Sequence, residues 1–149
     1  MFEITIPTGT PLTGSISAKI VDKEGVPPGN IIRADDDWAV KFHWTFKGQL
    51  ASCICGEWCL HVHMESIGKG PELDLFEDHD VRVPLNPCGD GEYWYTFEVP
   101  AGTVPAKGCG PVYKAVATLT YRTPCDKPGP IAGFVDLGLV QFYRDEKND

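Results

Sequence analysis

Residues 38–47 read WAVKFHWTFK, and apolar and polar side chains alternate through them with a period of two. One face of such an extended chain carries Trp38, Val40, Phe42, Trp44 and Phe46, and the residues between them occupy the other face. Alternation with aromatic and β-branched residues is typical of a half-buried β-strand. The stretch therefore predicts a strand with an aromatic core face.

The rest of the chain repeats this pattern between turns rich in glycine and proline. Alternating segments occur at residues 15–21, 58–66, 80–85, 92–99, 112–122 and 131–143. No window shows the 3.6-residue period of a helix. Because one face of every strand needs covering, the pattern predicts an all-β fold, a seven-stranded antiparallel two-sheet β-sandwich. Gly133 and Gly138 predict a bulge in the last strand.

Length and charge narrow the class of protein. A chain of 149 residues fits one domain, residues 1–149, with an N-terminal extension at 1–12 and a polar tail at 144–149. The net charge of −8 disfavours nucleic acid as a partner, and no apolar run is long enough for membrane insertion. No signal peptide is visible, so we expect a cytoplasmic protein, or an extracellular one if disulfides are present.

Strand number and spacing resemble those of immunoglobulin-like and fibronectin type III-like β-sandwiches. Tyr113, which enters the strand at 112–122 after a long connection, resembles the tyrosine that closes this corner in such domains. The resemblance implies immunoglobulin-like topology, with alternate loops at opposite ends. It departs from immunoglobulin domains because the strands at 38–47 and 112–122 carry no facing cysteines.

This topology places five of the six cysteines at one end and Cys109 at the other. Three interpretations remain open for the five. Cys53 or Cys55 joins Cys88 or Cys125 in one or two disulfides, the thiols stay reduced, or some of them bind zinc.

The strand at 58–66 directs Cys59, His61, His63 and Glu65 to its outer face. Histidines two residues apart on a strand point the same way, about 6–7 Å apart, and can clamp a metal. The candidate zinc ligands are Cys53, Cys55, Cys59, His61 and His63. The alternative is an ordinary solvated sheet face, and Cys–His catalysis lacks an orienting third group.

The opposite end is acidic. Asp35, Asp36 and Asp37 precede one strand, and Asp78 and Asp80 lie in a second acidic connection. Carboxylates from adjacent loops are ligands that calcium prefers, so these residues are candidate calcium ligands.

The N-terminus carries a short apolar ribbon, Phe2, Ile4 and Ile6. It either covers an edge of its own sheet or adds to a neighbour's sheet, with Cys109 as a further assembly residue. Trp94 is an additional candidate, as an exposed stacking platform for carbohydrate.

No catalytic motif appears in the sequence, so we expect no catalytic residues and no required cofactor. The leading hypothesis is a non-catalytic module for protein–protein interaction or self-assembly, with a protein or the chain itself as partner. The alternative is a calcium- or zinc-binding ligand-recognition module. A metal-dependent enzyme built on the cluster at residues 59–63 is a third hypothesis.

Overall fold

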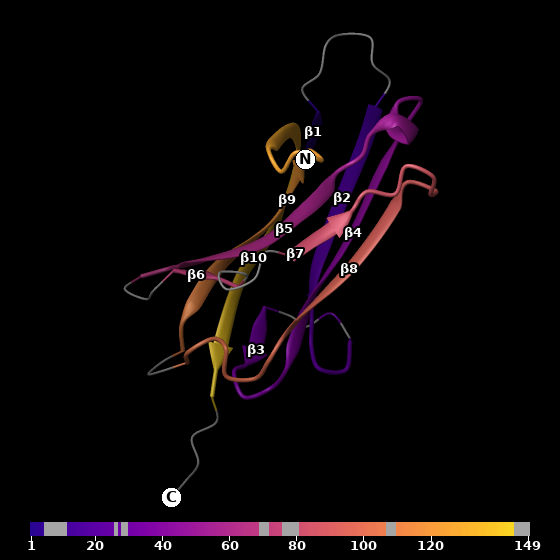
Figure 1. The fold of residues 1–149 in the computed structure, drawn as a ribbon. Coiled ribbons are helices and arrows are strands. Elements are labelled where there is room, and N and C mark those ends of the chain that lie inside the picture. Colours follow the sequence, from indigo (N-terminus) through magenta and orange to yellow (C-terminus); the bar gives the residue numbers. More distant parts are fainter. Residues whose placement is uncertain are drawn as a thin grey trace, which may run out of the picture.

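The computed structural model describes residues 1–4, 12–25, 27, 30–68, 72–75, 81–106 and 110–144, and they form two facing β-sheets (Figure 1). The elements are β1 (Phe2–Ile4), β2 (Leu12–Val21), β3 (Ile31–Arg33), β4 (Trp38–Gly48), η1 (Ala51–Cys53), β5 (Glu57–Ser66), β6 (Leu73–Asp74), β7 (Val81–Pro84), β8 (Glu92–Val99), β9 (Val112–Arg122) and β10 (Pro128–Tyr143). The predicted all-β sandwich is confirmed. Within the described ranges, no helix has the length and apolar composition needed to cross a membrane.

The smaller sheet has the order β2-β4-β8, and the larger has the order β1-β10-β9-β5-β6. β3 also pairs with β10, and β7 also pairs with β5. All pairs are antiparallel except β3 with β10. β4 and β5 therefore lie in different sheets, and their apolar faces meet in the core.

Three short strands distinguish the structure from the predicted seven. β3 and β6 have three and two residues, too few for an alternation to show in the sequence, whereas β1 is part of the apolar ribbon at the N-terminus. Each exists because it pairs with the edge of a longer strand. The predicted bulge in β10 is present as a register shift between Asp136 and Gly138, and Gly138 has a φ of 82°.

The N-terminal ribbon covers an edge of its own sheet. β1 pairs with β10 in the register Phe2↔Gly133, and the Phe2 ring packs edge-on against Trp58 with the ring centroids 6.3 Å apart. Gly14 makes room for it, because a Cβ there would lie 2.4 Å from the ring. Of the predicted assembly residues, Phe2 and Ile4 are thus engaged within the chain. Ile6 and Cys109 lie outside the described residues.

Trp58 on β5 is the centre of the core and has no solvent exposure. Its indole makes edge contacts with rings from both sheets. These are the rings of Phe2, Trp44, Phe46, Tyr93 and Tyr121. Rings in such T-shaped pairs contribute beyond their buried area, so Trp58 joins the two sheets.

Tyr113, the predicted corner residue, is fully buried against Phe142, with ring centroids 5.9 Å apart. Its hydroxyl forms no hydrogen bond with a described residue. Desolvation raises the pKa of this hydroxyl above its ordinary value. Tyr113 is therefore a buried core residue, and among the described residues it lacks the hydrogen bond that defines a corner tyrosine.

Replacing Trp58 with alanine removes contacts to both sheets and leaves a cavity. We expect the free energy of unfolding to fall by about 3–5 kcal/mol. The matched control is Trp94→Ala, because Trp94 is 68% exposed; its effect should stay within about 0.5 kcal/mol. Urea unfolding of both variants measures this, and similar losses would contradict the assignment of Trp58 as the central core residue.

Candidate functional site

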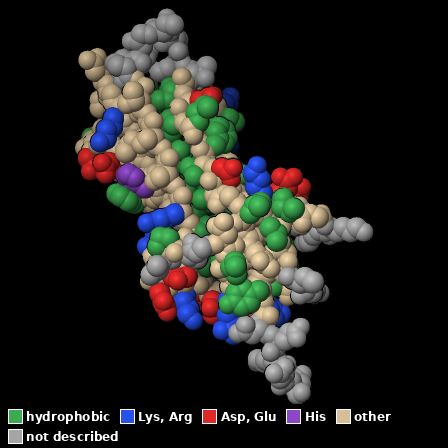
Figure 2. All heavy atoms as spheres, turned by 180° about the vertical axis from the view of Figure 1, so that it is seen from behind, with side chains coloured by type: hydrophobic (Ala, Val, Ile, Leu, Met, Phe, Trp, Pro, Cys, Tyr) green, Lys and Arg blue, Asp and Glu red, His purple; other side chains and the backbone are tan. Residues whose placement is uncertain are grey.

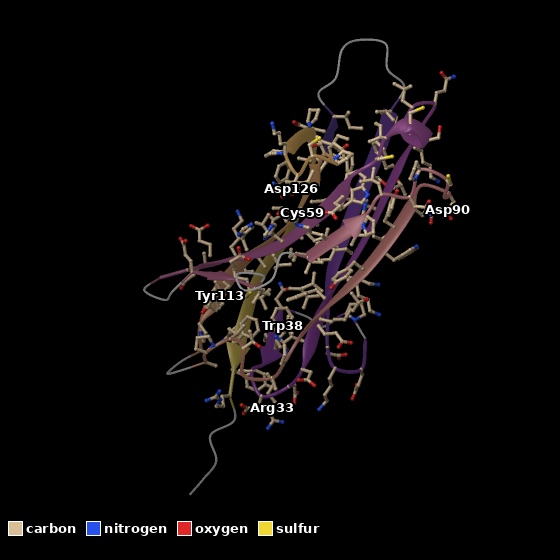
Figure 3. All side chains as sticks on the ribbon, in the orientation of Figure 1. Arg33, Trp38, Cys59, Asp90, Tyr113 and Asp126 are labelled. Carbon is tan, nitrogen blue, oxygen red and sulfur yellow. The ribbon has the colours of Figure 1, made fainter. Side chains whose placement is uncertain are left out.

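The cysteine-bearing loops gather at one end of the sandwich. Figure 3 shows Asp90 and Asp126, in the β7–β8 and β9–β10 turns, toward the end of the molecule opposite Arg33. The Tyr121 hydroxyl donates a hydrogen bond to the Cys55 carbonyl, which fastens the β4–β5 loop to β9. The predicted clustering of alternate loops is therefore present.

The structure forms no disulfide at this end. Cys53, Cys55, Cys88 and Cys125 are exposed and unpaired, so the predicted pairing of the first two with the last two is not formed. Neighbouring loops are not sufficient for a disulfide, which needs Cα atoms about 4.4–6.8 Å apart and aligned Cβ atoms. Cys59 differs from these four because it is buried, at 6% exposure.

A cluster of metal-ligand type lies on the outer face of the larger sheet. Among the described residues, one group of three or more His, Cys, Asp or Glu side chains has its ligand atoms within 4.8 Å of one another: His61, His63 and Asp74. Asp74 Oδ2 lies 3.8 Å from His61 Nδ1 and 3.9 Å from His63 Nδ1. The imidazoles stack with centroids 5.6 Å apart.

Strand pairing explains this geometry. β6 pairs antiparallel with β5 and places Asp74 directly opposite His63, so the two side chains share a face. His61, two residues earlier on β5, points to the same side. The backbone bond from Leu75 N to the Val62 carbonyl, 3.1 Å, holds this short strand in place.

The sequence predicted the two histidines but missed Asp74 as their partner. Asp74 belongs to the acidic connection that the sequence assigned to a candidate calcium site at the opposite end, and a strand of two residues has no detectable period. No sequence signal identified Asp74, because the pairing of β6 with β5 depends on the course of the connection between them. Glu65 and Glu72 extend the acidic surroundings, because they line a hollow of about 460 Å³ together with His63 and Asp74.

Cys59 contacts the same histidine from its other side. Its Sγ lies 3.6 Å from His61 Nε2, whereas Asp74 faces Nδ1. Cys59 is thus placed to orient His61 rather than to join the three ligand atoms. Cys53 and Cys55, the other tentative zinc ligands, are not part of this cluster.

At the acidic end, the three described candidate ligands Asp35, Asp36 and Asp37 each have a partner of their own. Asp35 pairs with Arg144 at 3.1 Å, and Asp36 pairs with Lys23 at 3.6 Å. Asp37 Oδ1 accepts a 2.7 Å hydrogen bond from the Ala101 amide. The three carboxylates have separate partners and are not gathered as calcium ligands would be. Asp78 and Asp80 lie outside the described residues.

Comparisons with known proteins add little to this description. No protein-family model matches the chain, and no curated protein matches its sequence. Among solved structures, a Niemann-Pick type C2 protein from the Japanese carpenter ant is similar at 16% sequence identity, over 95% of this chain and 98% of that one. The TM-score is 0.37, so this similarity carries no inference about the site.

In the same group of loops, the carboxylate of Asp126 holds the β9–β10 turn through hydrogen bonds with two arginines. Asp126 Oδ1 accepts hydrogen bonds from Arg122 at 2.8 Å and from Arg82 at 2.9 Å, and Arg82 also pairs with Glu57 at 3.3 Å. These bonds, that from Arg122 first, hold the pKa of Asp126 below its ordinary value of 3.8. Asp126 has a φ of 60°, a region that Asn also tolerates.

Asp126→Asn should lower the melting temperature slightly at pH 7, because it removes the charge and keeps the turn. The folded pKa is depressed, so the stabilisation is present above the unfolded pKa of 3.8 and is lost as the pH falls through the folded value. Thermal unfolding of both proteins from pH 7 downward measures the difference. A difference that grows as the pH falls would contradict the assignment.

The thiols should react in two groups. The test uses the Cys109→Ser variant, because Cys109 lies outside the described residues. In the native variant, we expect four thiols to react with a thiol reagent. Those are the exposed ones, and buried Cys59 should react only after unfolding. Fewer than four fast thiols would indicate a disulfide at the loop end.

Proposed function

We propose that this chain is a non-catalytic binding module that holds one divalent transition-metal ion through His61, His63 and Asp74. The observation that carries the proposal is the convergence of His61 Nδ1, His63 Nδ1 and an Asp74 carboxylate oxygen from two paired strands. The proposal develops the metal-binding alternative of the sequence, with Asp74 in place of Cys53, Cys55 and Cys59.

The donor set favours particular metals. Two imidazole nitrogens and one carboxylate oxygen suit zinc, copper(II) or nickel, whereas calcium and magnesium prefer oxygen ligands. Zinc is bound by nitrogen and oxygen at about 2.0–2.2 Å, which in a tetrahedron separates ligand atoms by roughly 3.3–3.6 Å. The 3.8 and 3.9 Å separations from Asp74 to the imidazoles need only small side-chain adjustments.

Three protein ligands leave at least one coordination position for water or for a group on another molecule. His63 is the most exposed of the three side chains, and the adjoining hollow is open to solvent on its side. A site of this kind recognises a ligand that supplies the remaining donor. This supports a binding role at the surface of the larger sheet.

Cys59 would tune the site as a positioning residue. In the tautomer that binds a metal through Nδ1, His61 Nε2–H donates to the Cys59 sulfur 3.6 Å away, and the Nδ1 lone pair is directed toward Asp74 and the ion. Partners of this kind fix the tautomer and ring orientation of a metal-bound histidine. The burial of Cys59 keeps this contact away from solvent.

The hypothesis of self-assembly through the N-terminus has less support. Phe2 and Ile4 pair with β10 of the same chain, so one edge of this segment is already used within the chain. The enzyme hypothesis also has less support, because its proposed Cys59 nucleophile is buried and lies beside the cluster rather than in a cleft.

Isothermal titration with Zn²⁺ tests the proposal. We expect one ion per chain with a dissociation constant on the order of 1–100 μM. The double variant His61→Ala/His63→Ala should abolish binding, and Asp74→Asn should weaken it at least tenfold. Asp136→Asn, a carboxylate on the same sheet face but two strands away, is the matched control and should leave the affinity unchanged.

Cobalt substitution separates the roles of the ligands. A Co²⁺ complex held by nitrogen and oxygen lacks the near-ultraviolet thiolate-to-cobalt charge-transfer band, whereas a site that uses Cys59 or the loop cysteines would show it. Unchanged zinc affinity in Asp74→Asn, or binding that survives the double histidine variant, would also refute the site.

A further inference from the structure

The outer face of the smaller sheet carries an exposed aromatic platform, independent of the proposed metal site. Trp94 on β8 lies directly opposite His43 on β4, and their rings stack with centroids 3.8 Å apart and an interplanar angle of 26°. One face of the indole is thus supported by imidazole, while the residue as a whole remains 68% exposed. Figure 2 shows a histidine beside a hydrophobic side chain on this side of the molecule, with basic side chains on both sides.

Polar contacts fix the platform in place. Glu92, two residues before Trp94, has carboxylate oxygens 3.7 Å from His43 Nε2 and 3.6 Å from Lys47 Nζ. On the neighbouring strands, Ser15 and Thr45 share a 2.8 Å hydrogen bond. The indole therefore projects from a rigid surface of hydroxyl and charged groups rather than from an apolar patch.

The next row of the sheet contains an unfavourable charge pair. Lys19 on β2 lies directly opposite Lys41 on β4, and Thr96 completes the row beside Trp94. Like charges in directly opposite positions destabilise a sheet. Within the part of the chain that the structure describes, no carboxylate pairs with either lysine. An anion bound at this row would relieve the repulsion.

A surface hollow adjoins this row. Lys41, Thr96 and Glu98 line it from the sheet, and Lys23 and Asp37 line it from the flanking loops. Its volume of about 360 Å³ is in the range of small-ligand sites. Residues two apart on a strand are separated by about 6–7 Å. A ligand of two linked rings, the first stacked on Trp94, would therefore reach Lys41 and the hollow with the second.

From these contacts we propose that the Trp94 face binds an acidic saccharide. One pyranose ring stacks on the free face of the indole, whose negative π-face attracts the polarised C–H bonds of a sugar. A carboxylate or sulfate of the next unit lies at Lys41 and Lys19. Thr96 and the carboxylate of Glu98 are the hydrogen-bond partners for hydroxyl groups.

The surroundings distinguish this ligand from other occupants. A protein partner docked on Trp94 would have to desolvate the lysines and Glu92 around a single aromatic residue, whereas hotspots cluster in fully desolvated pockets. Nucleic acid carries a phosphate on every nucleotide and needs clustered Lys and Arg side chains, whereas this face offers one lysine pair on neighbouring strands. A saccharide that stacks one ring on the indole and places a carboxylate of the next unit at the lysines satisfies both the stacking face and the lysine pair.

The four tryptophans of the chain provide a selective probe. Trp38, Trp44 and Trp58 are buried, so acrylamide quenches chiefly the fluorescence of Trp94. Titration with trigalacturonic acid should protect this fluorescence with a dissociation constant on the order of 0.1–1 mM. Maltotriose, a neutral trisaccharide, should bind at least fivefold more weakly.

Variants assign the contacts, with affinity measured by isothermal titration. Trp94→Ala should weaken trigalacturonate binding at least tenfold, and Lys41→Gln about fivefold with a reduced dependence on salt. Lys114→Gln, an exposed lysine on the larger sheet, is the matched control and should have no effect. Circular dichroism melts of each variant establish that the fold is intact.

Several outcomes would overturn the proposal. They are no protection of Trp94 at about 10 mM trigalacturonate, equal affinity for maltotriose, or an unchanged affinity in Trp94→Ala. Protection that rises with protein concentration without sugar would assign the face to a second copy of the chain instead. None of these outcomes bears on zinc binding at His61 and His63, because the two sites lie on different sheets.

Discussion

The packing of Trp58 between the two sheets is the interaction on which the rest of the structure depends. Its indole contacts rings from β4 and β8 of the smaller sheet and rings from β1 and β9 of its own sheet. Because side chains alternate along a strand, burying Trp58 also buries Leu60, Val62 and Met64. The same register turns His61 and His63 outward. A shift of one residue would bury the histidines and expose the core, so the position of the proposed metal ligands is a consequence of the core.

Both candidate sites lie on outer sheet faces and use cross-strand neighbours. Asp74 reaches the β5 histidines through the β5–β6 pair, and Trp94 reaches His43 through the β4–β8 pair. Side chains in such positions are held by backbone hydrogen bonds rather than by loops, so little ordering is needed when a ligand binds. One sandwich can therefore present two independent sites, one for a metal ion and one for a saccharide.

The seven long strands and their core faces could be predicted from the sequence, because each has enough residues for a period of two to appear. The outward direction of His61 and His63 followed from the same period. Asp74 could not be predicted as their partner, because β6 has two residues and its pairing depends on the course of the preceding connection. The separation of Asp35, Asp36 and Asp37 onto Arg144, Lys23 and Ala101 depends likewise on tertiary neighbours. Three consecutive aspartates in the sequence indicated that this end is acidic. They could not indicate how the three carboxylates are arranged, because their partners are distant in the chain.

The central functional claim is that His61, His63 and Asp74 together bind one metal ion. Zinc-edge X-ray absorption on the full chain loaded with one equivalent of Zn²⁺ tests it most directly. We predict a first shell of nitrogen and oxygen at about 2.0–2.2 Å, with outer scattering from two imidazoles. A sulfur shell at about 2.3 Å, or an oxygen shell without imidazole scattering, would contradict the account.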